Sequence, residues 1–157
     1  MRSDSDLPEA TRRVFEAVEY DASVHVFPEG TKTAEDAARA IGCDVSAIVK
    51  SLVFCVDDEP VVALVPGDLR LDTAKLADVA GGTSARRADL NEVRDATGFA
   101  AGGTPPFGHA STLRVFADPA LKRNDPVWAA AGTPSSVFPI SIADLDRLAA
   151  PVWITVT

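Results

Sequence analysis

The most constraining feature of the sequence is a pair of apolar, β-branched segments joined by a short polar turn. Residues 48–56 (Ile-Val-Lys-Ser-Leu-Val-Phe-Cys-Val) and residues 61–65 (Val-Val-Ala-Leu-Val) flank an Asp-Asp-Glu-Pro turn. This pattern predicts a β-hairpin. Because the strands are apolar almost continuously, and not in alternation, we expect them to be buried on both faces at the centre of a sheet.

The other segments predict helices and strands in irregular order. Capping residues and glycine stops indicate helices at 7–20, 34–41, 72–80, 89–96 and 142–149. Short β-branched runs predict further strands at 24–27, 113–116, 127–128, 137–140 and 152–156. Since no regular βαβ rhythm is present, we expect an α+β fold, a mixed sheet forming a partly closed barrel flanked by helices. No linker-like stretch divides the 157 residues, so a single domain over 1–157 is predicted.

Composition and charge narrow the classes of function. The hydrophobic share of 46% and the net charge of −8 are those of a globular, acidic chain. This charge excludes a protein that binds nucleic acid by overall positive charge, although it leaves room for a local basic patch. Cys43 and Cys55 form a lone pair without a Cys-x-x-Cys motif or flanking histidines, which gives neither a zinc-ligand set nor a disulfide framework. The polar N-terminus and the lack of a long apolar run predict a cytoplasmic protein without membrane association.

Lys50, followed by Ser51, is a charged residue near the start of the predicted buried strand. One interpretation is a lysine whose stem is buried while its ammonium group reaches solvent. The other is a cation directed into a cleft, where it meets a phosphate or carboxylate.

A second feature is the loop from Gly102 to Gly108, which contains Gly103, Thr104, Pro105 and Pro106. Glycines let backbone N–H groups approach a ligand, and prolines fix the loop in advance. Such N–H groups can hold a carbonyl or oxyanion, although a tight surface turn has the same composition.

Standard nucleotide-binding, metalloprotease and serine-hydrolase motifs are absent from the sequence. The two histidines, His25 and His109, cannot form an all-histidine metal site. His25 is either a structural residue at a rim or part of a pocket, and His109 is expected to be exposed. We therefore expect a site without metal or cofactor.

Four segments, taken in order, resemble the YbaK/EbsC family, the stand-alone relatives of the editing domain of bacterial prolyl-tRNA synthetase. They are Thr33–Ala38, Lys50–Phe54, Gly67-Asp68 with Lys75-Leu76, and Gly98–Gly108. The resemblance spans about residues 20–150. It implies a mixed α/β barrel-like fold, no metal, and hydrolysis of aminoacyl-tRNAs that carry the wrong amino acid.

The resemblance also implies roles for individual residues. Lys50 matches a lysine placed near the terminal adenosine and its phosphate, and the Gly102 and Gly103 N–H groups match those that grip the ester carbonyl. Phe27 stands where some relatives have tyrosine, and Ser135 lies in a segment that varies among editing domains. Substrate binding is accordingly expected from Phe27, His25, Ser51, Thr104, Pro106 and Ser135.

The implied reaction is ester hydrolysis without a protein nucleophile, in which water or the ribose 2′-OH takes part in attack. The implied substrate is mischarged tRNA-Pro, held weakly by its acceptor end, with a prolyl-tRNA synthetase as a candidate second partner. A non-catalytic nucleotide- or protein-binding module, and hydrolysis of a small non-tRNA ester or amide, remain alternatives. If tRNA binds, a basic rim is expected from Lys50, Arg70, Lys75, Arg86, Arg87, Lys122 and Arg123.

Overall fold

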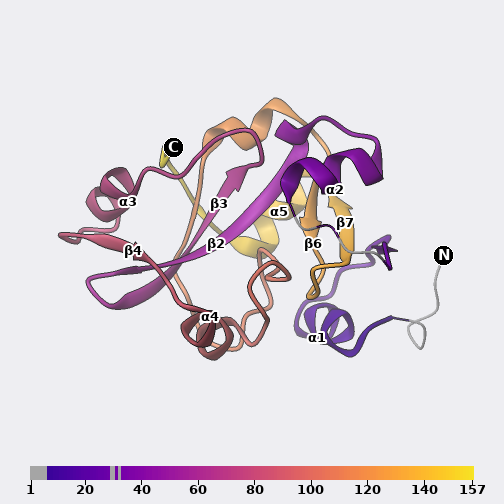
Figure 1. Cartoon of the computed structure of the whole chain (residues 1–157), viewed down its shortest axis with the longest axis horizontal. Coiled ribbons are helices and arrows are strands. Elements are labelled where there is room, and N and C mark those ends of the chain that lie inside the picture. Colours follow the sequence, from indigo (N-terminus) through magenta and orange to yellow (C-terminus); the bar gives the residue numbers. More distant parts are fainter. Residues whose placement is uncertain (1–6, 29–30, 32) are drawn as a thin grey trace.

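A computed structural model of the chain describes residues 7–28, 31 and 33–157. One mixed sheet runs through the molecule, and helices pack around it (Figure 1). The helices are α1 (Glu9–Ala17), α2 (Ala34–Ile41), α3 (Thr73–Val79), α4 (Leu90–Thr97) and α5 (Ile142–Ala149), with short 3-10 helices η2 (Val45–Ala47) and η3 (Pro119–Arg123). The strands are β1 (His25–Val26), β2 (Ile48–Val56), β3 (Glu59–Pro66), β4 (Ala85–Arg87), β5 (Val115–Ala117), β6 (Val127–Ala130), β7 (Ser136–Ile140) and β8 (Val152–Trp153).

The predicted hairpin is the centre of the sheet. β2 and β3 pair antiparallel along their whole length, with Lys50 opposite Val65 and Val56 opposite Glu59. The strand order is β1-β7-β6-β2-β3-β5-β8, and β4 pairs with the second half of β2. The β2–β6, β3–β5 and β5–β8 pairs are parallel. The structure confirms the α+β fold and the mixed sheet, whose end strands β1 and β8 are not paired with each other among the described residues.

Both faces of the hairpin are buried, as the apolar strands predict. Val62 and Leu64 pack into one core with Phe138, whereas Val61 and Val65 pack into a second core. All four of these β3 side chains are fully buried. Because side chains alternate along the strand, they pack into two cores, one on each side of the sheet.

The predicted helix starts are confirmed by side-chain caps. Thr33, Asp72, Asp89 and Ser141 each accept a hydrogen bond from a backbone N–H in the first turn of the following helix. The first helix is shorter than predicted, because the backbone is already extended at Val18. Strand β4 was not predicted at all.

The predicted last strand, 152–156, is also shorter in the structure, because Asp118 binds the residues that follow β8. Its carboxylate accepts hydrogen bonds from the N–H groups of Val156 and Thr157 and from the Thr157 hydroxyl, at 2.9–3.1 Å. Asp118 is only 3% exposed. Burial by itself raises the pKa of Asp118, but these hydrogen bonds and one from Ala120 N–H outweigh it and lower the pKa.

We predict that Asp118→Asn destabilises the fold by about 1–3 kcal/mol, because buried N–H donors lose their charged acceptor. Since the pKa of Asp118 is lowered in the folded state, its contribution is full above the ordinary carboxyl pKa and disappears as the pH falls through the folded value. Urea unfolding at about pH 7 and about pH 3 measures this. The variant should lose less stability on acidification than the wild type, and exposed Asp95→Asn serves as control. Equal pH dependence in both proteins would contradict this account of Asp118.

Candidate functional site

A gap in the pairing of β2 creates a cavity. On the side away from β3, β6 pairs with residues 48–49 of β2 and β4 pairs with residues 54–56. Among the described strands, none pairs with residues 50–52 on this side. The carbonyl oxygen of Val53 accepts one hydrogen bond on this side, from the N–H of Ala88. Residues 50–52 are the half-buried stretch of an otherwise buried strand. The cavity at this gap has a volume of about 560 Å³ and lies between α2, α4, β6 and the loop at Ala101–Thr104.

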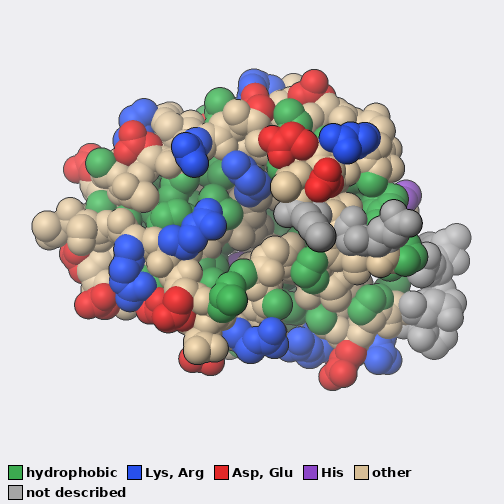
Figure 2. Space-filling model, in the orientation of Figure 1, with side chains coloured by type: hydrophobic (Ala, Val, Ile, Leu, Met, Phe, Trp, Pro, Cys, Tyr) green, Lys and Arg blue, Asp and Glu red, His purple; other side chains and the backbone are tan. Residues whose placement is uncertain are grey.

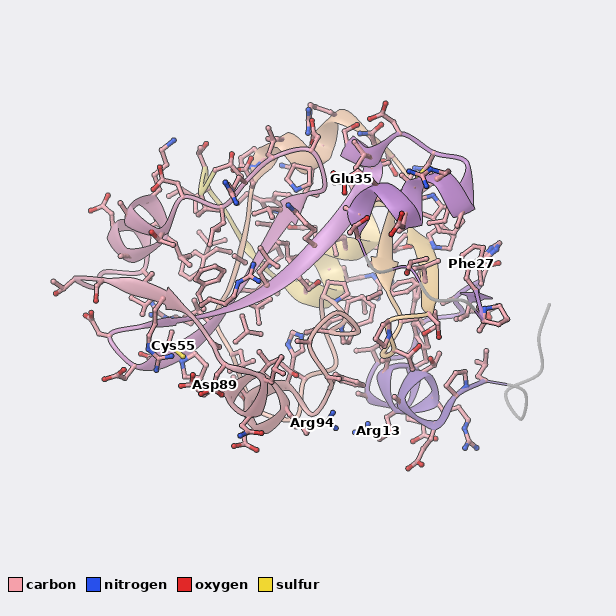
Figure 3. The ribbon with its side chains drawn as sticks, in the orientation of Figure 1. Arg13, Phe27, Glu35, Cys55, Asp89 and Arg94 are labelled. Carbon is pink, nitrogen blue, oxygen red and sulfur yellow. The ribbon has the colours of Figure 1, made fainter. Side chains whose placement is uncertain are left out.

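Lys50 lines this cavity. Lys50 Nζ donates a hydrogen bond to the carbonyl oxygen of Leu69 at 2.8 Å, which leaves further protons for a ligand. Burial lowers the pKa of Lys50, although the nearby carboxylates of Glu35 and Asp68 act in the opposite direction. Figure 3 shows Glu35 on α2, and it does not line the cavity. The lysine is thus a half-buried cation fixed by one carbonyl.

Ser51 lines the same cavity and points to the opposite face of β2 from Lys50. Its hydroxyl is buried and has no hydrogen-bond partner among the described residues. An unpaired buried hydroxyl costs free energy, which a ligand that supplies a partner would recover.

The glycine loop contributes Gly102 and Thr104 to the cavity wall, as the sequence predicts. Gly102 has a φ of +87°, a conformation that favours glycine. Among the described residues, no hydrogen bond occupies the Gly102 N–H. Gly102, with no intramolecular partner for its N–H among the described residues, therefore lies on the wall of the same cavity as Lys50.

Gly103 differs from its predicted role as a carbonyl-binding donor. Its N–H already donates to the carbonyl oxygen of Ala100 at 3.0 Å, and Gly103 does not line the cavity. A Cβ at this position would lie 2.7 Å from the Cα of Thr133. Gly103 is thus a packing residue, and it lets the loop at 101–104 lie against the loop at 132–134.

His109 also differs from expectation, because it is half-buried and not exposed. Its Nε2 shares a hydrogen bond of 2.7 Å with the carbonyl oxygen of Pro105, in which the ring N–H donates. Burial lowers the pKa of His109. Pro106 is buried in the same loop, outside the cavity wall. His109 and Pro106 therefore act as supports of the loop.

Besides Pro106, three predicted substrate-binding residues lie outside the cavity wall: His25, Phe27 and Ser135. His25 is exposed and contacts Trp128 edge to face, with ring centroids 5.2 Å apart. Phe27 donates its N–H to the carbonyl oxygen of Ser135 at 2.7 Å, and Figure 3 shows Phe27 at the edge of the molecule. Trp128 and Pro134, their neighbours, line the cavity instead. The cavity wall is thus formed by neighbours of the predicted residues and not by His25, Phe27 or Ser135 themselves.

The predicted basic rim is smaller than expected. Lys50 and Arg87 line the cavity, and Figure 2 shows basic side chains beside apolar ones near the centre of this face. Arg86 is paired with Glu92 and Arg123 with Asp68, each at 2.7 Å. The remaining predicted cations do not line the cavity: Arg70, Lys75 and Lys122.

The described residues bring no three His, Cys, Asp or Glu side chains together in a way that could hold a metal ion. In the same part of the chain, the helices are too short or too polar to cross a membrane. Arg87 of β4 was expected in the basic rim, but the part of the cavity wall formed by Leu90 and Val93 of α4 was not predicted from the sequence. Apolar residues in a predicted amphipathic helix carry no motif that could have revealed it.

Comparison with known proteins identifies the family of the chain. The model of the aminoacyl-tRNA editing domain matches residues 28–148. The uncharacterized protein YwhH of Bacillus subtilis is 36% identical over 132 residues, which cover 83% of each chain. The proline–tRNA ligase of Nitratidesulfovibrio vulgaris is 38% identical over 99 residues, which are 63% of this chain and 17% of the ligase.

A solved structure resembles the whole chain. It is that of a protein proposed to be a trans-editing enzyme for prolyl-tRNA synthetase, with a TM-score of 0.90 and 38% identity. The match covers 97% of this chain and 99% of the other. Because the family model matches residues 28–148 and the fold agrees with this structure, the chain belongs to the family of aminoacyl-tRNA editing domains.

Proposed function

We propose that the chain is an aminoacyl-tRNA deacylase that acts in trans, hydrolysing the ester bond of misacylated tRNA. The observation that carries the proposal is the position of Lys50 and Gly102 on the wall of one cavity. These residues come from a central strand and a distant loop, and they offer a cation and a backbone N–H to the same ligand. An ester between an amino acid and a phosphate-bearing ribose needs both.

In the proposed reaction, water attacks the ester carbonyl, and the electron pair of the broken C–O bond leaves with the ribose oxygen. The Gly102 N–H stabilises the oxyanion that forms during attack. Lys50 holds the neighbouring phosphate and so positions the ester. The ribose 2′-OH is the group of the substrate nearest to the bond, and it assists the water.

The proposed substrate is tRNA-Pro charged with a small wrong amino acid. The support is the similarity to the proline–tRNA ligase and to the protein proposed to edit for prolyl-tRNA synthetase. The net charge of −8 favours weak binding of the acceptor end, with a synthetase as the partner that retains the rest of the tRNA. Deacylation of alanyl-, cysteinyl- and seryl-tRNA-Pro, against prolyl-tRNA-Pro, tests the proposal. No hydrolysis above the buffer rate in a broad panel of aminoacyl-tRNAs would refute it.

Lys50→Ala is expected to reduce kcat/KM for the preferred aminoacyl-tRNA by about ten- to a hundredfold, because hydrogen bonds to charged groups contribute about 1.5–3 kcal/mol. Lys75→Ala is the matched control. Lys75 also donates to a backbone carbonyl, that of Thr157 at 2.7 Å, but lies outside the cavity wall. Equal losses of kcat/KM in both variants would show that Lys50 is not part of the site.

Gly103→Ala should reduce kcat by tenfold or more (of order 1.4 kcal/mol or above) without changing the overall fold. The added Cβ would push Gly102 away from its place, since Thr133 lies 2.7 Å away and cannot yield. Gly81→Ala is the control for backbone strain alone, because its φ of +77° disfavours alanine while a Cβ there meets nothing within 4 Å. Single-turnover deacylation and circular dichroism measure the two effects. An active Gly103→Ala enzyme would show that the loop's position is not required.

A further inference from the structure

Leu90 is an exposed apolar side chain on the wall of the cavity. It is 74% exposed although it is the first residue of α4, and it lines the cavity with Arg87. Val152 is the other exposed large hydrophobic residue among those described, at 55%, and it lies outside the cavity wall. An exposed leucine adds little to folding, so its place beside the cavity is available for contact with a ligand.

Arg87 stands beside Leu90 and is free to bind an anion. The two arginines of β4 point to opposite faces of the strand. Arg86 is paired with Glu92 and Asp58, whereas no carboxylate among the described residues pairs with Arg87. The Arg87 guanidinium lies 5.9 Å from the centre of the Phe54 ring, and its charge acts on Lys50. Phe54 thus supports a cation on the same side of the sheet as Lys50.

The two ends of the cavity differ in chemistry. On the α2 side the wall is formed by small residues, Ala34 and Ala37, near which Glu35 supplies negative charge. On the α4 side the wall has Arg87 and Leu90. Glu35 offsets part of the positive charge of Lys50, whereas no carboxylate among the described residues pairs with Arg87, so a phosphate held by Lys50 is drawn toward the α4 side. A small amino-acid side chain fits the alanine-lined end, which leaves the α4 end for the nucleotide.

We propose that Leu90 and Arg87 form a nucleoside-binding lip, in which Leu90 packs against the face of the terminal base and Arg87 binds the adjoining phosphate. The inference rests on the proposed function, since it assigns the part of the substrate that carries the ester. Bases present flat faces that contact apolar side chains without sequence readout. The guanidinium of arginine is suited to phosphate. Leu90 and Arg87 are therefore positioning residues.

Binding of adenosine 5′-monophosphate and of ribose 5-phosphate, which lacks the base, separates the two contacts. Both can be followed by titration with NMR detection. The wild type should bind the nucleotide at least fivefold more tightly than the sugar phosphate. Leu90→Ala should remove this difference, Arg87→Ala should weaken both ligands, and Val152→Ala should change neither. Equal binding of the two ligands by the wild type, a difference that survives Leu90→Ala, or no saturable binding of either ligand would each overturn the lip.

Kinetic measurements distinguish a failure of the lip proposal from a failure of the proposed deacylase function. For a protein that deacylates tRNA, Leu90→Ala should raise KM for aminoacyl-tRNA about five- to tenfold and leave kcat unchanged. Val152→Ala, a substitution outside the cavity wall, should leave both constants as in the wild type. A wild type that hydrolyses no aminoacyl-tRNA but binds nucleotide through Leu90 would refute the deacylase and retain the lip. A change in kcat alone would refute a positioning role for Leu90.

Discussion

The site depends on an interruption in the hydrogen bonding of one strand. β2 is buried on both faces and paired with β3 along its full length, so it cannot bend out of the sheet. Its other side is shared by β6 and β4, which leave residues 50–52 without a strand partner among those described. Backbone polar groups in such a gap need a partner, and the site therefore forms where the sheet itself is incomplete.

Close packing of backbone on backbone completes the cavity wall. Gly103 lies against Thr133, and Gly132 lies against the carbonyl of Ala10, where a Cβ would approach the oxygen to 2.8 Å. Residues from α1, from the loop at 102–104 and from the loop at 132–134 thus meet without side chains between them. Loops held in this way are preorganised, which is what a donor for a developing oxyanion requires.

Local signals in the sequence allowed most of the fold to be predicted, and part of the site. The hairpin, the capped helices at Thr33, Asp72, Asp89 and Ser141, and the place of Lys50 follow from patterns within a few residues. Contacts between distant segments could not be predicted in this way. The engaged N–H of Gly103, the pairing of Arg86 with Glu92, and the cavity positions of Pro134 and Leu90 depend on how loops and strand β4 meet β2.

The register of the hairpin has a consequence for how the family can diversify. Because side chains alternate along β2, a shift of one residue would move Lys50 and Ser51 to each other's faces and bring a charge into a core. The register of β2 therefore cannot shift by one residue without placing Lys50 in a core. New preferences for an amino acid or a tRNA must arise from substitutions in the surrounding walls, α2, α4 and the two loops, while the hairpin beneath them stays constant.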